Sequence, residues 1–133
     1  LLRLAQVLIT AGRIEDAEQA VEEADGIARR SGHRDYALDV VAARVSLLTA
    51  RGRNADAVAM GRAAAEEQPG SVTAHLTLAN ALRADGQLDL ALASAREAVR
   101  LAELRAAAEP TVVVHARSTL GRIEAELAAR DRR

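Results

Sequence analysis

Three glycines carry the same neighbours at the same distances along the chain, and this repetition constrains the fold more than any other feature. An alanine lies five residues after each glycine, another lies twelve after it, a leucine lies four before it, and a small or β-branched residue lies seven before it. The three sets are Gly12 with Ala17, Ala24, Leu8 and Ala5; Gly52 with Ala57, Ala64, Leu48 and Val45; and Gly86 with Ala91, Ala98, Leu82 and Ala79. Self-similarity at intervals of 34 to 40 residues is typical of helical repeat arrays.

These offsets have a physical reading. A glycine can adopt the left-handed conformation that ends one helix and turns the chain into the next. The two alanines lie on one face of the second helix, where small side chains let two antiparallel helices approach closely. Half of the residues are apolar but only about one in a hundred is aromatic, so Leu, Val, Ile and Ala must build the core. Each hairpin keeps an apolar face that only a neighbouring hairpin can cover.

Hydrophobic periodicity and capping residues predict an all-α fold of about seven helices, over residues 1–11, 14–30, 36–51, 55–68, 72–85, 88–108 and 111–130. Asp35, Asn54 and Ser71 are the predicted N-caps of the third, fourth and fifth helices. The stretch Thr111–Val114 has strand propensity, but it has no partner strand and the helical period continues after it. We therefore predict a helix there.

The pattern resembles the tetratricopeptide repeat (TPR). The residues that carry the resemblance, over about residues 1–110, are Leu4-Ala5 with Leu8, Leu78-Ala79 with Leu82, the three glycines and their alanines, and the closing Pro69. The longer glycine spacing is similar to a variant of about 40 residues in bacterial regulators. The resemblance implies antiparallel hairpins stacked as a right-handed superhelix in one domain.

The predicted units cover about residues 1–33, 34–70 and 71–109, with a final or capping helix over 111–131. Arg44-Val45 departs from the family's leucine and small residue in the second unit. The last helix fits the repeat in two registers. In one register Leu120-Gly121 is the leucine and small pair, and in the other Leu127 precedes a turn at Asp131.

In this family the first helix of each unit lines a concave groove. The resemblance therefore implies a partner-binding groove that includes Gln6, Ile9, Thr10, Asp39, Ala42, Ser46, Thr49, Thr73, Leu76, Asn80 and Arg83. This polar, nearly uncharged mixture suits hydrogen bonding to a peptide backbone or a helix edge. The alternative is that these residues only keep the array soluble. A clamp for a C-terminal carboxylate is not expected, because its positions hold Leu2, Gln6, Thr73 and Thr77.

The sequence predicts no catalytic residues, no metal site and no cofactor. It has no cysteine, and His33, His75 and His115 lack a second ligand at helical spacing. It contains no phosphate-binding loop, nucleophile elbow or dinucleotide fingerprint. The formal charge of −1 does not favour nucleic-acid binding, and no apolar run is long enough for a membrane span. A cytoplasmic location is expected.

The leading functional hypothesis is a non-catalytic scaffold that binds a peptide, a helix or a neighbouring domain of its parent chain in the concave groove. One alternative is a regulatory or sensor segment of a larger bacterial transcription regulator or signalling ATPase. Another is self-association through apolar faces at the ends of the array. The sequence does not choose the partner.

Overall fold

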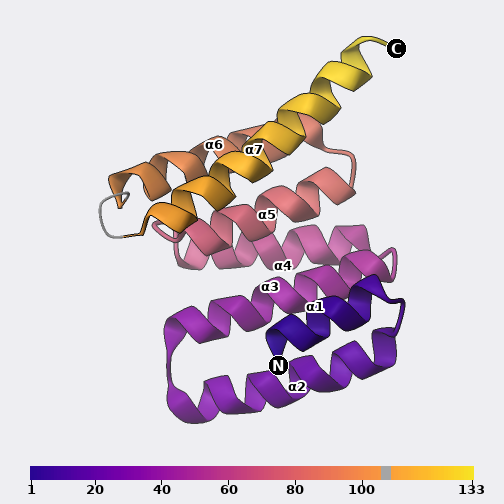
Figure 1. The fold of residues 1–133 in the computed structure, drawn as a ribbon, viewed down its shortest axis with the longest axis vertical. Helices are drawn as coiled ribbons and strands as arrows, with labels where there is room; N and C mark the ends of the chain where they lie inside the picture. The colour runs from indigo at the N-terminus through magenta and orange to yellow at the C-terminus, as the bar shows by residue number, and fades with distance from the viewer. Residues whose placement is uncertain (106–108) are drawn as a thin grey trace.

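The chain folds into α-helices that follow one another in a stack, as a computed structural model shows (Figure 1). The structure describes residues 1–105 and 109–133. Over these residues there are seven helices: α1 (Leu2–Thr10), α2 (Ile14–Ser31), α3 (Arg34–Ala50), α4 (Asn54–Glu67), α5 (Val72–Ala84), α6 (Leu88–Leu104) and α7 (Pro110–Asp131). The all-α prediction is confirmed.

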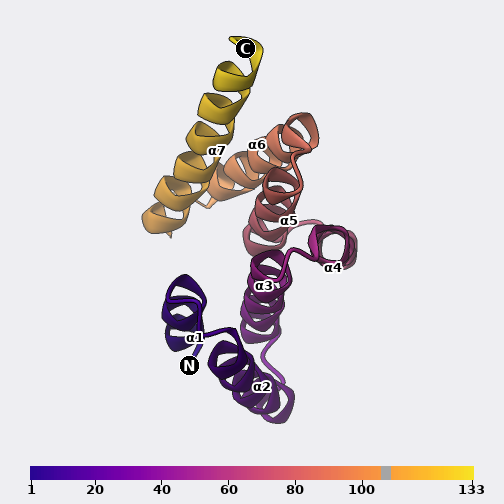
Figure 2. The same cartoon turned by 90° about the vertical axis from the view of Figure 1, so that its right-hand side faces the viewer.

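Each helix packs against the helix before it, so α1–α2, α3–α4 and α5–α6 form hairpins. In addition, α3 contacts α1, α5 contacts α3, and α7 contacts α5. The odd-numbered helices therefore form one continuous wall. Figure 2 shows α1 and α7 on the same side of α3 and α5, so this wall is curved and its hollow side opens between α1 and α7.

The turns after α1, α3 and α5 have one shared geometry. Gly12, Gly52 and Gly86 have positive φ angles of 79°, 75° and 81°, which side chains other than glycine rarely adopt. The residue after each glycine donates its backbone N–H to the carbonyl of the leucine four residues before the glycine, at 2.8, 2.8 and 2.9 Å. The glycine N–H donates to the carbonyl of the residue three positions before the glycine. This is the Schellman arrangement, and it explains why the leucine and the glycine keep a fixed spacing.

The repeated alanines lie where the helices are in closest contact. Those at the first offset, Ala17, Ala57 and Ala91, are fully buried. The alanines twelve residues after each glycine are also buried. Three apolar clusters make up the core, and they consist of Ala, Leu, Val and Ile, with Tyr36 and Met60 at their edges. The core composition predicted from the sequence is therefore confirmed.

Ser71 caps α5 as predicted, since its hydroxyl accepts a hydrogen bond from the Ala74 N–H at 3.2 Å. The other two cap predictions are wrong. Helix α3 begins at Arg34, so Asp35 lies within its first turn, where a negative charge still favours the helix dipole. Asn54 is the first residue of α4, and its side-chain amide donates to the Ala84 carbonyl at 3.3 Å instead. It therefore ties the start of α4 to the end of α5.

The sixth helix ends earlier than predicted. Helix α6 stops at Leu104, and Arg105 follows in a turn. The remainder of that prediction, residues 106–108, lies outside the described residues. The segment Thr111–Val114 is helical, as predicted, because Pro110 opens α7 as its first residue, where its missing N–H costs nothing.

Burial identifies the register of α7. Its buried residues Ala116 and Thr119 repeat the positions of Ala74 and Thr77 in α5. Both threonine hydroxyls donate to the carbonyl four residues earlier, at 2.8 Å for Thr77 and 3.3 Å for Thr119. With this offset, Leu120-Gly121 occupy the repeat positions of Leu78-Ala79. This is the first of the two registers considered above. No turn follows at the corresponding point, and α7 continues to Asp131.

Arg44 stands where the repeat pattern predicts a leucine, and its side chain forms ion pairs with α2. Its guanidinium bonds Glu22 at 2.7 Å and Asp25 at 3.1 Å, both on α2, and these bonds raise the pKa of Arg44. In the next hairpin the equivalent residue is Leu78, and there α4 approaches through Gly61. A Cβ atom on Gly61 would lie 3.1 Å from the Leu78 Cα. Each junction between hairpins therefore has its own pair of complementary residues.

Candidate functional site

The curved wall of odd-numbered helices encloses a hollow of about 510 Å³. Four helices contribute to it, α1, α3, α5 and α7, so it lies on the concave side that Figure 2 displays. We call it the concave groove. Its lining residues are Gln6, Ile9, Val45, Ser46, Thr49, Ala50, Asn80, Ala81, Arg83, Ala84, His115 and Arg122.

Two rows of equivalent positions build this surface. The first row lies six residues before each turn glycine and contains Gln6, Ser46 and Asn80; the register of α7 adds Arg122. The second row lies three residues before the glycines and contains Ile9, Thr49 and Arg83. Because residues three apart on a helix are neighbours on one face, the two rows run side by side across the array.

The polar side chains of the groove differ in whether their hydrogen-bonding groups have partners within the protein. The Ser46 hydroxyl donates to the Ala42 carbonyl at 3.2 Å, within its own helix. Arg83 donates through Nη1 to the Glu126 carboxylate of α7 at 2.9 Å. Its Nε is buried and, within the described part of the chain, has no hydrogen-bond partner. Among the described residues, the fold therefore leaves this buried donor unsatisfied.

Five of the predicted groove residues are brought together here: Gln6, Ser46, Thr49, Asn80 and Arg83. Ile9, predicted with them, also lines the groove. All six lie in the two rows that are counted back from the glycines. The repeat pattern therefore locates these positions, because the Schellman turn fixes the rotation of each preceding helix relative to its glycine.

The other predicted positions lie elsewhere. Leu76 is buried with only 6% of its surface exposed, in the cluster beneath α6 and α7, so it is not a groove residue. Thr73 and Ala42 are half-buried and are not among the residues that line the groove. The Thr10 hydroxyl is exposed and donates to the Gln6 carbonyl at 3.0 Å.

Asp39 lines a separate surface hollow beside Tyr36, near the start of α3. Partial desolvation of its carboxylate raises its pKa, and the negative charge of Asp35, one turn earlier, adds to the rise. Much of the residue is nevertheless exposed. Asp39 therefore lies at the end of α3 that is far from the groove.

Six groove-lining residues were missed from the sequence: Val45, Ala50, Ala81, Ala84, His115 and Arg122. From the sequence, His115 was excluded as a metal ligand, and Arg122 was not singled out. The available signal was the Leu120-Gly121 register, which makes Arg122 equivalent to Asn80. That register could not be chosen without knowing which face of α7 is buried.

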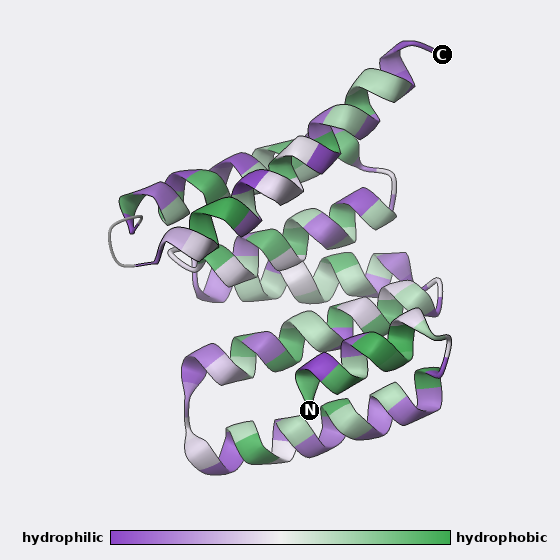
Figure 3. Cartoon of the chain, in the orientation of Figure 1, coloured by the Kyte–Doolittle hydropathy of each residue, from purple (hydrophilic) through white to green (hydrophobic). Residues whose placement is uncertain are grey.

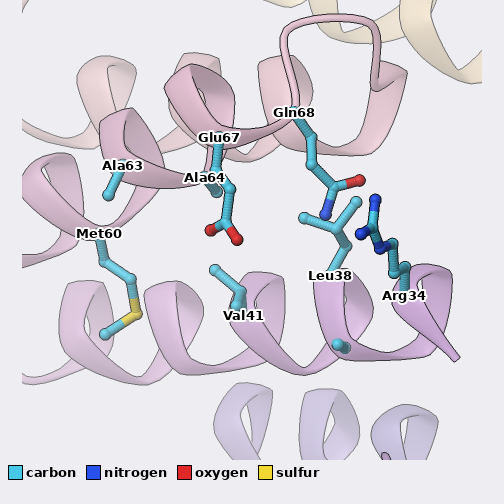
Figure 4. Close-up of a pocket in the computed structure, with 9 residues that line it drawn as sticks. Arg34, Leu38, Val41, Met60, Ala63, Ala64, Glu67 and Gln68 are labelled. Atoms are coloured by element: carbon cyan, nitrogen blue, oxygen red, sulfur yellow. The ribbon is translucent and has the colours of Figure 1, made fainter. Parts of the chain in front are cut away.

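A second hollow, of about 460 Å³, lies between α3 and α4. Figure 4 shows Leu38 and Val41 pointing from α3 towards α4, with Met60 and Glu67 pointing back. Arg34 lies at one end of this hollow, beside Gln68. The floor of this hollow is apolar, and one rim is charged. Ala63 and Ala64 also line the hollow, and their small side chains leave space between the two helices.

The described residues show no group of three or more His, Asp or Glu side chains that could hold a metal ion. His75 is engaged in the turn after α4, where its Nε2 lies 2.8 Å from the Pro69 carbonyl. Over the same residues, none of the helices combines the length and apolar character needed to cross a membrane.

Comparison with known protein families, with curated proteins and with solved structures gave no significant match. The resemblance to the tetratricopeptide repeat therefore stays a prediction from the sequence pattern.

Proposed function

We propose that this chain is a non-catalytic interaction module that binds a polypeptide segment in the concave groove. The observation that carries the proposal is that four helices distant in sequence present matched rows of side chains to one hollow of about 510 Å³. A hollow of this size accommodates several side chains of a bound segment.

The lining chemistry supports a polypeptide ligand. Gln6 and Asn80 carry amides that both donate and accept hydrogen bonds, as the backbone of an extended segment requires. Ile9, Ala50 and Ala84 provide apolar surface between these polar groups. The module belongs, in this proposal, to a right-handed superhelix of the tetratricopeptide type.

The test is a selection of random displayed peptides on the immobilised chain, followed by affinity measurement with the enriched peptides. Ser46→Arg places a long side chain in the middle of the groove, and we expect it to abolish binding. Ser118→Arg makes the same change on an exposed part of α7 that lines none of the hollows described, and it should leave binding unchanged. Equal binding to both variants would exclude the groove.

Self-association is a second candidate function, favoured by an exposed apolar face on α1. Val7 is 64% exposed, whereas the equivalent residues Leu47 and Ala81 are 7% and 1% exposed because the preceding hairpin covers them. Leu1 and Leu4 extend the same face. Figure 3 shows α1 strongly hydrophobic, in contrast to the mixed surface of the C-terminal half of α7.

Light scattering over a range of concentrations tests this candidate. Self-association through α1 predicts a mass that rises with concentration, and Val7→Glu should return the protein to a monomer. A constant monomeric mass at the highest soluble concentration would rule the candidate out.

A further inference from the structure

The chemistry of the concave groove changes from one end to the other. At α1 the two rows present the amide of Gln6 and the apolar side chain of Ile9. At α3 they present the hydroxyls of Ser46 and Thr49. At α5 and α7 they present Arg83 and Arg122, so the rows that begin neutral become cationic.

Three basic side chains meet at the cationic end. His115 and Arg122 lie on α7 and line the groove together with Arg83 of α5. No Asp or Glu is among the groove-lining residues. A cluster with excess positive charge attracts an anionic group, and guanidinium groups bind carboxylates through paired hydrogen bonds.

The carboxylate that pairs with Arg83 does not neutralise all three basic side chains. Glu126 bonds the Nη1 of Arg83 at 2.9 Å, and its carboxylate is 38% exposed in side-chain surface. This contact holds the Arg83 guanidinium against α7 while leaving its Nε without a partner among the described residues. Arg122 forms no ion pair within the part of the chain that the structure describes. Of the three basic side chains, only Arg83 is thus paired with the Glu126 carboxylate.

The opposite end of the groove suits an apolar side chain. Ile9 of α1 lines it, and the exposed Ala50 of α3 lines the same groove; neither residue offers a side-chain hydrogen bond. A segment lying across the four helices therefore meets apolar surface at α1 and positive charge at α7.

We propose that the segment bound in the groove carries an aspartate or glutamate side chain that contacts Arg83 and Arg122, and an apolar side chain that contacts Ile9. This inference rests on the proposed function and specifies its ligand. Two of the three basic side chains, His115 and Arg122, come from α7, which does not belong to the three hairpins.

The experiment uses three pools of randomised peptides of equal length, with net negative, neutral and positive charge. Their ends are acetylated and amidated, so that any carboxylate comes from a side chain. We expect the acidic pool to bind roughly tenfold more tightly than the neutral pool at low salt. The preference should decrease as salt is added.

Arg122→Gln removes the charge but keeps a polar side chain. In this variant the ratio of the affinity for the acidic pool to that for the neutral pool should fall to near one. The matched control is Arg96→Gln, an exposed arginine on α6 that lines none of the hollows described; it should retain the preference. Equal affinity for the three pools overturns the inference, as does an equal loss in both variants.

The two proposals fail in distinguishable ways. If the pools bind without charge preference and Ser46→Arg abolishes that binding, the groove is the binding site and only the acidic ligand is refuted. If binding is insensitive to Ser46→Arg, the groove itself is refuted.

Discussion

The junction between α4 and α5 offers a sharp test of how this array is packed. Gly61 is a buried glycine in the interior of α4, where glycine lowers helix stability by about 1 kcal/mol relative to alanine. A glycine at such a position is explained if a side chain does not fit there. A Cβ atom at this position would lie 3.1 Å from the Cα and 3.4 Å from the N of Leu78.

The magnitude follows from the atoms that are contacted. Both are backbone atoms of α5, so the contact can be relieved only by moving one helix against the other. Overpacking of this kind costs about 1–3 kcal/mol. Since the gain in helix propensity is about 1 kcal/mol, we expect Gly61→Ala to lower the free energy of unfolding by about 1 kcal/mol.

Gly121→Ala is the matched control. Gly121 also lies inside a helix, but a Cβ there would have no atom within 4 Å, so this variant should gain about 1 kcal/mol. Gly26→Ala should also gain, because its Cβ would meet only the flexible end of Arg30, at 3.3 Å. Urea denaturation followed by circular dichroism measures all three. If Gly61→Ala stabilises the protein as much as Gly121→Ala, the close helix contact does not exist.

Substitutions at three further positions test local interactions through the free energy of unfolding. Arg44→Ala should cost about 1–2 kcal/mol, less at high salt, because it leaves the half-buried Asp25 without this partner. Ser71→Ala should cost about 1 kcal/mol through the lost cap of α5, and Ser71→Asp should restore it. The pKa of Asp39 is higher in the folded protein, so the folded state binds this proton more tightly and stability falls as pH rises through the ordinary aspartate range. Asp39→Asn should therefore be more stable than the wild type at neutral pH and equal to it below pH of about 3.

The helical architecture could be predicted because backbone geometry encodes it locally. A left-handed glycine, a leucine one turn earlier and two buried alanines are each required by the turn or by a close helix contact. The N-caps of α3 and α4 were predicted wrongly because several polar residues precede each helix, and the tertiary contact of Asn54 with Ala84 competes with capping.

The groove could be predicted only where its register is tied to a glycine. Ser46 and Asn80 were found in this way, whereas Leu76 was misassigned because it lies further from the turn, where α6 and α7 cover the helix. Arg122 has no following glycine turn in its helix. Its position became clear only from the burial of Ala116 and Thr119.

The identical turns also determine where this chain can change length. The interval between the turn glycines is 40 residues in one case and 34 in the other, and α2 is four residues longer than α4. The distance from each first-row position to its glycine is always six residues. Deleting one residue between Ser46 and Gly52 would rotate Ser46 by about 100° around α3 and remove it from the groove. A deletion between α2 and α3 would leave that alignment intact. Insertions and deletions in related chains should therefore accumulate after the alanines of each hairpin and be absent before its glycine.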